Sequence, residues 1–430
     1  MDESPFGEAP EETAAVIAAL QEEKRDDFPR AVRALRNPNF RLFWTGNFLS
    51  NIGTWMQNVA QGWLVMKLAT SNSAFWLGVV GFAASSPMLI FALIGGVIAD
   101  RVDRRRLMLV TQTSMMVFAF ILCAITFAKI VNIPEIVLLA FANGLAMSLN
   151  TPSYQALVPQ LVPRQDLTNA IALNSAQFNL SRVLGPTLGG FAMAWFGIAG
   201  NFFLNGISFL AVIIALMQIQ YPPVYAENRA SLWENLAEGF RYAFERREMV
   251  VLFTLVGLAS VFGIPYLIFV PLFAHDILHV QERGLGILMA SSGLGAFLGA
   301  ATIAYLGQVK CRGKFVVRAS IPFFTAIILF AFSRWFALSC LLLMLAGYSM
   351  ILVVATVNAL LQHLSSDVMR GRVMSIYATA FLGFAPIGSL LAGSVASAIG
   401  APRAIAAMAA MALVGIITLY FWNPELKRLD

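Results

Sequence analysis

Long apolar runs follow one another along most of the chain, and short polar joints separate them. A helix needs about 20 predominantly apolar residues to cross the hydrocarbon core of a bilayer. The runs of that length are 40–66, 75–99, 107–128, 133–159, 167–196, 200–220, 250–275, 284–306, 317–333, 336–362, 372–397 and 402–422. The pattern therefore predicts an all-α membrane protein with twelve transmembrane helices.

One long polar stretch divides this series into two sets of six helices. Within it, the segment from Ser231 to Phe244 has an apolar residue at every third or fourth position, which is typical of a helix at the membrane surface. We therefore expect a cytoplasmic N-terminal segment (1–38), an N-terminal six-helix bundle (39–220), a cytoplasmic linker with an interfacial helix (221–249), a C-terminal six-helix bundle (250–422) and a cytoplasmic tail (423–430).

A weak internal repeat supports the division into halves. A shift of 203 residues places Gly144 on Gly347 and Gly190 on Gly393, along with a few other identities. Two parallel six-helix repeats are typical of transporters whose halves rock about a site near the membrane midplane.

Composition and charge agree with a membrane protein and set its orientation. Hydrophobic residues make up 59% of the chain and charged residues only 12%, whereas soluble domains have about 25% charged residues. With both termini in the cytoplasm, 23 of the 29 lysines and arginines lie on the cytoplasmic side, as positively charged inner loops require. The net charge of +6 is explained by these loops, so we expect no nucleic-acid partner.

The sequence offers little for catalysis or metal binding. The three cysteines are far apart, and no CxxC, HExxH, nucleophile elbow or ATP-binding motif appears. We therefore expect a monomer that has no enzymatic activity, no metal and no cofactor, and that does not use ATP directly.

A distinctive motif lies between the second and third predicted helices. It places Gly96, Asp100, Arg101, Arg104 and Arg105 within ten residues at the inner membrane face. A carboxylate there can bond the end of a neighbouring helix and the local arginines, so that opening the protein to the inside would break those bonds. The alternative is a basic loop that only fixes the orientation.

This motif resembles the cytoplasmic signature of the major facilitator superfamily, Gly-x-Leu-Ala-Asp-Arg-x-Gly-Arg-Arg, with Ile98 and Asp103 at the two positions that differ. The segment Asn39–Trp44 is similar to the branch of enterobactin-exporter-like and macrolide-efflux-like proteins. The fifth helix carries a motif that resembles the antiporter motif of the superfamily's exporters, namely Gly185, Pro186, Gly189 and Gly190. The resemblance covers 40–422 and implies the two-bundle fold of that superfamily and a conformational gate at the cytoplasmic motif.

Uncharged polar residues form stripes on two helices. The first helix carries Asn47, Asn51, Thr54, Asn58 and Gln61, and the fourth carries Asn143, Asn150 and Tyr154. A polar stripe is costly against lipid, so it faces either water or a partner helix. We expect a substrate cavity, because the resemblance implies that helices 1, 4, 7 and 10 line one. Hydrogen bonding between helices is the alternative.

Two further sites carry charge. Arg182 lies near the middle of the fifth helix, where it either contacts an anion or substrate, forms a gate, or bonds carbonyl groups of a neighbouring helix. His275 and Asp276, at the outer edge of the seventh helix, are the candidates for coupling transport to protons. The sequence does not establish the coupling ion.

Together, these features predict a secondary transporter of a bacterial-type inner membrane. We expect it to export amphipathic small molecules that are drug-like or siderophore-like. An importer or a lysolipid flippase of the same fold is the alternative within transport. A membrane sensor or scaffold without flux is the alternative outside it.

Overall fold

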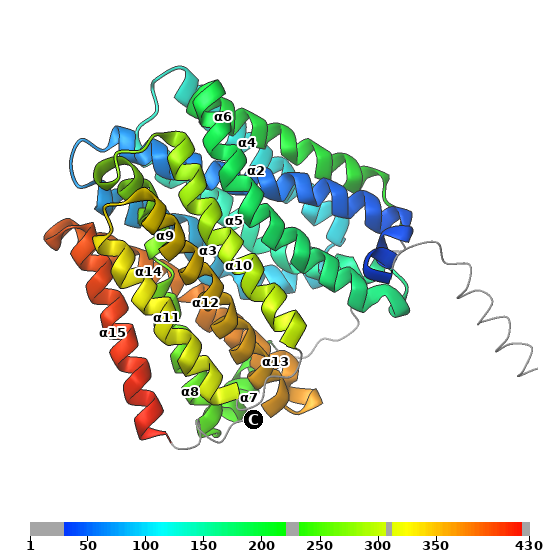
Figure 1. Cartoon of the computed structure of the whole chain (residues 1–430). Helices are drawn as coiled ribbons and strands as arrows, with labels where there is room; N and C mark the ends of the chain where they lie inside the picture. Colours follow the sequence, from blue (N-terminus) through cyan, green and yellow to red (C-terminus); the bar gives the residue numbers. More distant parts are fainter. Residues whose placement is uncertain (1–29, 221–231, 307–311, 424–430) are drawn as a thin grey trace, which may run out of the picture.

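The computed structural model describes residues 30–220, 232–306 and 312–423, and all regular secondary structure in these ranges is helical (Figure 1). For residues 30, 92–101, 232–237, 312, 367, 368 and 382 it describes the backbone only. The predicted fold class, an all-α membrane protein, is confirmed. The predicted N-terminal segment before residue 30 and the C-terminal tail from residue 424 lie outside the described residues.

The helices of the first half are η1 (Arg30–Arg36), α2 (Pro38–Leu68), α3 (Ser73–Arg101), α4 (Arg104–Phe127), α5 (Ile133–Leu157), η2 (Val158–Gln160), η3 (Arg164–Asp166) and α6 (Leu167–Gln218). A separate helix, α7 (Leu232–Phe244), follows. The second half contains α8 (Arg247–Leu258), η4 (Ala259–Gly263), α9 (Tyr266–Leu272), η5 (Phe273–Ile277), α10 (Glu282–Leu306), α11 (Arg312–Phe332), α12 (Phe336–Leu364), α13 (Asp367–Ala378), η6 (Thr379–Gly383), α14 (Ala385–Ile399) and α15 (Ala401–Trp422).

Ten segments of the described residues are long and apolar enough to cross a membrane. One of them, 164–218, has 55 residues, or about 80 Å of helix, which is enough for two crossings. We expected a joint between 196 and 200, but α6 instead turns at Gly197 alone, whose φ of 71° and ψ of 178° favour glycine. The polar helix α2 is not among the ten. The count of twelve crossings stays a prediction.

Equivalent glycines of the predicted repeat make equivalent contacts between the halves. Gly190 of α6 faces Gly286 of α10, and Gly393 of α14 faces Gly78 of α3. A Cβ atom added to Gly190 or to Gly393 would lie 2.9 Å from the Cα of the glycine opposite. The backbones of the two halves therefore touch directly along two seams.

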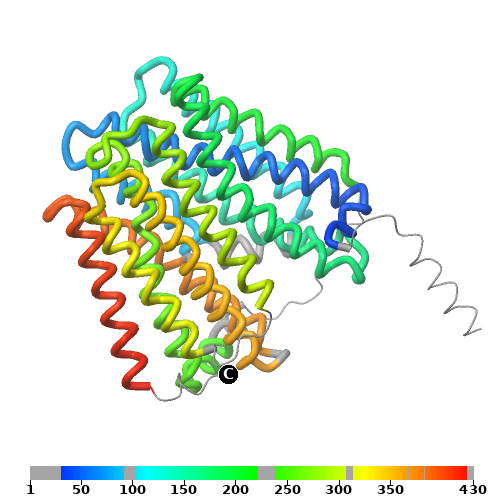
Figure 2. The backbone as a smooth tube through the Cα atoms, in the orientation of Figure 1, coloured from blue at the N-terminus to red at the C-terminus, as the bar shows by residue number. Residues whose placement is uncertain are grey.

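These glycine contacts lie toward one end of the molecule. We call it the closed end, where α2 ends and α10 begins, and we call the other end, where α2 and α6 begin, the open end. In Figures 1 and 2 the blue-to-green helices and the yellow-to-red helices converge at the closed end and diverge toward the open end.

An ionic latch, formed by Trp63, Lys67 and Glu282, joins the halves at the closed end. Glu282 Oε1 accepts hydrogen bonds from Trp63 Nε1 at 3.0 Å and from Lys67 Nζ at 2.8 Å. Trp63 and Lys67 belong to α2, and Glu282 begins α10. The latch therefore bonds the last turns of α2 to the first turn of α10.

The helix predicted over 231–244 is α7, and it packs beside α13 (Figure 1). Glu238 forms an ion pair with Arg372 at 2.5 Å, and Ser366 N–H donates to the Tyr242 hydroxyl at 3.2 Å. The latter bond is the main cause that lowers the pKa of Tyr242 from its ordinary value. These bonds attach α7 to the second half rather than leaving it as a free linker.

Candidate substrate cavity

A cavity of about 580 Å³ opens at the open end between α2, α5 and α6. Its lining residues are Asn47, Asn51, Met147, Asn150, Thr151, Tyr154, Gln155, Val158, Pro159, Ile171, Asn174, Ser175, Phe178 and Asn179. None of them is charged. Drug-sized ligands occupy pockets of roughly 300–1,000 Å³ in which apolar surface is combined with a few polar groups. The cavity therefore suits an uncharged or weakly charged part of an amphipathic molecule.

The structure brings together some of the predicted cavity residues. Those in the lining are Asn47, Asn51, Asn150 and Tyr154. Those outside it are Thr54, Asn58, Gln61, Asn143 and Arg182. The binding of substrate by any of these nine residues stays a prediction.

Polar side chains of α2, taken beyond the predicted stripe, lie on two sides of the helix. Asn47 and Asn51 line the cavity, whereas Gln57 is buried and its Oε1 accepts a hydrogen bond of 2.7 Å from Asn205 Nδ2 of α6. The Thr54 hydroxyl donates to the Ser50 carbonyl of its own helix at 3.0 Å. Two residues of the predicted stripe therefore lie in the cavity wall, whereas the helix–helix bond is made by Gln57, outside that stripe. Which of the two alternatives explains the whole stripe stays a prediction.

Asn150 is the best-positioned polar group of α5. Thr111 Oγ1 and Gln112 Nε2 of α4 donate to its Oδ1 at 3.1 and 3.3 Å. Both bonds use the oxygen and fix the orientation of the amide, and no described residue accepts from its NH2 group. Because Asn150 lines the cavity, that NH2 group is a donor available to a ligand.

The α6 wall of the cavity was not anticipated from the sequence. Asn174, Ser175, Phe178 and Asn179 line it together with Ile171. These positions are three or four residues apart, so they share one face of the helix. This spacing can be seen in the sequence, but α6 carries small and polar residues on several of its faces. Only the packing of the neighbouring helices decides which of these faces lines the cavity.

The cavity ends at a small aromatic cluster. The rings of Trp55 and Phe178 meet edge to face with centroids 6.0 Å apart. The Arg182 guanidinium lies over the Trp55 ring at 6.0 Å from its centroid. Arg182 follows Phe178 by one helical turn, so its charge lies just beyond the innermost lining residues.

The predicted fifth-helix motif, Gly185, Pro186, Gly189 and Gly190, lies where α6 packs closely against both α2 and α10. A Cβ atom on Gly189 would lie 3.1 Å from the Met56 Cα of α2, and one on Gly185 would lie 3.0 Å from the Ile52 carbonyl oxygen. On the other side, the Pro186 carbonyl and Gly190 face Gly286 of α10. The motif therefore provides close packing at the closed end, next to the cavity rather than in its lining.

The arginines of the cytoplasmic motif attach to the helices of the first half. Arg104 Nη1 donates to the Ala156 carbonyl of α5 at 3.3 Å, and Arg105 Nη2 donates to the Met217 carbonyl of α6 at 2.5 Å. Asp103 caps α4, because its Oδ1 accepts from Arg106 N–H at 2.8 Å. The side chains of Gly96, Asp100 and Arg101 lie outside those described, so the predicted role of Asp100 stays a prediction.

The candidate coupling residues lie at the closed end, away from the cavity. His275 Nδ1 and Asp276 Oδ1 are 2.6 Å apart, and both side chains are about half exposed, at 48% and 45%. The His275 ring meets the Trp63 ring edge to face at 5.5 Å. The pair is therefore a neighbour of the ionic latch.

Comparisons with known proteins give relatives over nearly the whole chain. The staphyloferrin A transporter of Staphylococcus aureus is 24% identical over 90% of this chain and 97% of its own length. The enterobactin exporter EntS of Citrobacter koseri is 25% identical over 91% of this chain and 93% of its own. The multidrug efflux pump Tap of Mycolicibacterium fortuitum is 25% identical over 86% and 92%.

Solved structures show the same fold. The nucleoside transporter NupG superposes with a TM-score of 0.72 at 12% identity, over 89% of this chain and all of that one. A bacterial homologue of the human lysosomal transporter Spinster, in an inward-facing and unoccupied conformation, has a TM-score of 0.71 at 14% identity, over 92% and 97%. A family model described as transmembrane secretion effector matches residues 30–430. The chain therefore belongs to the transmembrane secretion effector family of the major facilitator superfamily, as a multi-pass membrane protein.

Proposed function

We propose that this protein is a secondary active exporter of amphipathic small molecules, and that it works by alternating access. The observation that carries the proposal is a cavity at one end of the molecule, with the two halves joined at the other end. The cavity lies at the open end, while glycine seams and the ionic latch join the halves at the closed end. A transporter in one of its two access states has this arrangement.

The relatives support a cargo of siderophore-like or drug-like molecules. Their names refer to staphyloferrin A, enterobactin and multidrug efflux. The lining of the cavity fits such cargo, because it combines aromatic and aliphatic side chains with amide donors such as those of Asn47 and Asn150. A site for a small sugar or phosphate would have less apolar surface or more charge.

The basic residues support an orientation with both termini in the cytoplasm of a bacterial inner membrane. In this orientation the open end faces the cytoplasm, and the state described is the one that loads cargo for export. His275 and Asp276 are the candidates for proton coupling, and the protein acts as a monomer. Replacing Asp276 by Asn should abolish any dependence of transport on the proton gradient. If transport by the variant still depends on the proton gradient, Asp276 and His275 do not couple transport to protons.

Flux measurements test the proposed function directly. Inside-out vesicles that contain the protein should accumulate a fluorescent drug or an iron-free siderophore when a proton gradient is applied, and control vesicles should not. Binding without accumulation under any ion gradient would favour the sensor or scaffold alternative.

Cysteine labelling tests the cavity itself. In a background without native cysteines, Asn51→Cys should react with a small thiol reagent from the cytoplasmic side, and a transported substrate should protect it. The matched control is Leu49→Cys, whose position on α2 is outside the lining and 48% exposed. Equal protection at both positions would indicate a general conformational effect rather than a substrate site.

One observation favours the lipid-flippase alternative. A second, apolar cavity of about 420 Å³ lies between α7, α8, η4 and η6, and Phe240, Phe244 and Phe384 are among its lining residues. An acyl chain would match this lining. Movement of a fluorescent lysophospholipid between leaflets, at a rate comparable to drug flux, would support that alternative.

A further inference from the structure

Arg182 occupies the position where the cavity ends and the two halves meet. It lies 15 residues after the first residue of α6, which is about 22 Å along the helix and near its membrane midpoint. Its carbonyl oxygen would lie 2.7 Å from a Cβ atom on Gly293 of α10, so the backbone at Arg182 packs on the second half. Its side chain extends toward Trp55 of α2, next to the innermost part of the cavity.

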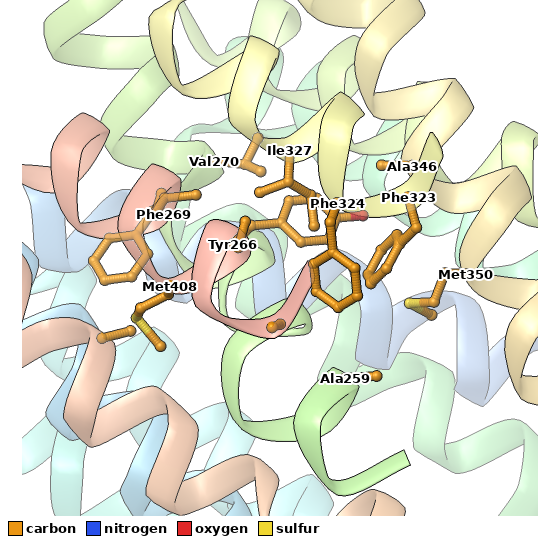
Figure 3. Packing of buried hydrophobic residues seen from close by; sticks show 14 of the residues in the cluster. Ala259, Tyr266, Phe269, Val270, Phe323, Phe324, Ile327, Ala346, Met350 and Met408 are labelled. Carbon is orange, nitrogen blue, oxygen red and sulfur yellow. The ribbon is translucent and has the colours of Figure 1, made fainter. Parts of the chain in front are cut away.

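Within the part of the chain that the structure describes, no carboxylate forms an ion pair with Arg182. The acidic residues nearest to the spans of the described chain, such as Glu135, Asp166, Asp276 and Glu282, lie at helix ends. Among the described residues, no hydrogen-bond acceptor or carboxylate is bonded to the guanidinium. It lies over the Trp55 ring and also interacts electrostatically with Tyr266, a buried core residue of the second half (Figure 3). A carbonyl group of a neighbouring helix, which would satisfy a purely structural arginine, does not bond it in this state.

An intramembrane charge that lies next to a cavity and has no ion-pair partner is a candidate binding group for the opposite charge. The side chain of Arg182 is partly accessible rather than enclosed, which allows a ligand to reach it. The adjoining rings of Trp55 and Phe178 offer flat apolar surface within one helical turn of the charge. A ligand with a carboxylate or another anionic group next to an aromatic or apolar portion would satisfy both features.

We infer that Arg182 is the anion-binding group of this cavity and that the exported molecules are amphipathic organic anions. The inference rests on the proposed function and adds the chemical class of the cargo. The anion bonds the guanidinium at the inner end of the cavity, the aromatic portion packs on Trp55 and Phe178, and amides such as that of Asn150 donate to polar groups nearer the opening.

Equilibrium binding to the purified full-length protein tests this assignment with three probes of one shape and different charge. They are naphthalene-2-carboxylate, naphthalene-2-carboxamide and 2-naphthylmethylamine. The carboxylate should bind the unmodified protein about tenfold tighter than the amide, because a bond between charged groups is stronger than a neutral one. The difference should vanish in Arg182→Gln and persist, reduced, in Arg182→Lys. The matched control is Arg283→Gln, because Arg283 also lies over a ring, that of Phe191 at 5.9 Å, but it is exposed at the closed end.

Thermal stability without ligand separates this role from a structural one. Removing a charge that has no ion-pair partner from the middle of a membrane helix should leave the melting temperature of Arg182→Gln unchanged or higher. If Arg182→Gln lowers the melting temperature and weakens the binding of all three probes equally, Arg182 has a structural role and the inference is overturned. A carboxylate that binds the unmodified protein no tighter than the amide, or not at all, would overturn it too. Charge-selective binding without flux in vesicles would instead refute the proposed export and leave the anion site standing.

Discussion

The ionic latch at the closed end predicts how strongly one residue controls the access state. Glu282→Gln keeps the shape of the side chain but removes its charge. The ion pair with Lys67, whose side chain is 45% exposed, contributes at most about 1 kcal/mol. In the variant, the buried Trp63 N–H donates to a neutral amide oxygen instead of a carboxylate. This weaker hydrogen bond costs up to about 1 kcal/mol more. The total of about 1–2 kcal/mol should shift the equilibrium toward opening of the closed end by roughly 5- to 30-fold.

Thiol accessibility measures this shift. Ser389 of α14 is buried next to Gly81 of α3 in one of the seams, so a cysteine there should react with an impermeant reagent only when the closed end opens. Its labelling rate should rise by the same 5- to 30-fold factor in Glu282→Gln. Glu135→Gln is the control, because Glu135 caps α5 within the first half and joins no seam. An unchanged rate in Glu282→Gln, or an equal rise in the control, would refute the latch.

Three further predictions concern orientation, gating and the seams. A cysteine at Ser71 should react with an impermeant reagent from outside the cell and one at Gln308 should not; the reverse pattern would invert the topology. Asp100→Asn should reduce transport per molecule by about tenfold or more with near-normal abundance and substrate binding, because one charge-assisted bond is lost; low abundance with normal transport per molecule would contradict gating. Gly190→Leu should force the α6–α10 seam apart and raise the Ser389 labelling rate in the assay above, whereas Gly371→Leu, where a Cβ atom has free space, should not; equal labelling in the two variants would contradict the seam.

The fold followed from the sequence because each of its determinants is local. Apolar runs of helical length define spans, and the positions of arginines define the sides of the membrane. Four of the fourteen lining residues could be predicted in the same way, because each is a polar residue on an apolar helix. They are Asn47, Asn51, Asn150 and Tyr154. The break after residue 196 was predicted, but its reduction to the single residue Gly197 was not, because a positive φ leaves no mark in hydropathy.

The rest of the site depends on tertiary packing. The α6 wall could not be selected from the sequence, because Asn174, Ser175 and Asn179 are no more polar than the buried Gln177 beside them. The ionic latch joins residues 215 and 219 positions apart, and Glu282 looks like any acidic residue at the end of a span. Which helices lie together at the closed end is decided by the contacts of the whole chain.

The polar character of α2 also has a consequence for biosynthesis. This helix leaves the ribosome first among the candidate spans, yet it is the one whose composition alone does not favour the bilayer. Its buried Gln57 finds its partner only in Asn205, near the end of α6. We therefore expect α2 to reach its final packing only after about 170 further residues have been synthesised, which is the distance from its first residue to that partner. The first half should become resistant to extraction and to membrane proteases as one cooperative unit, and nascent chains that stop before α6 should be targets for quality control.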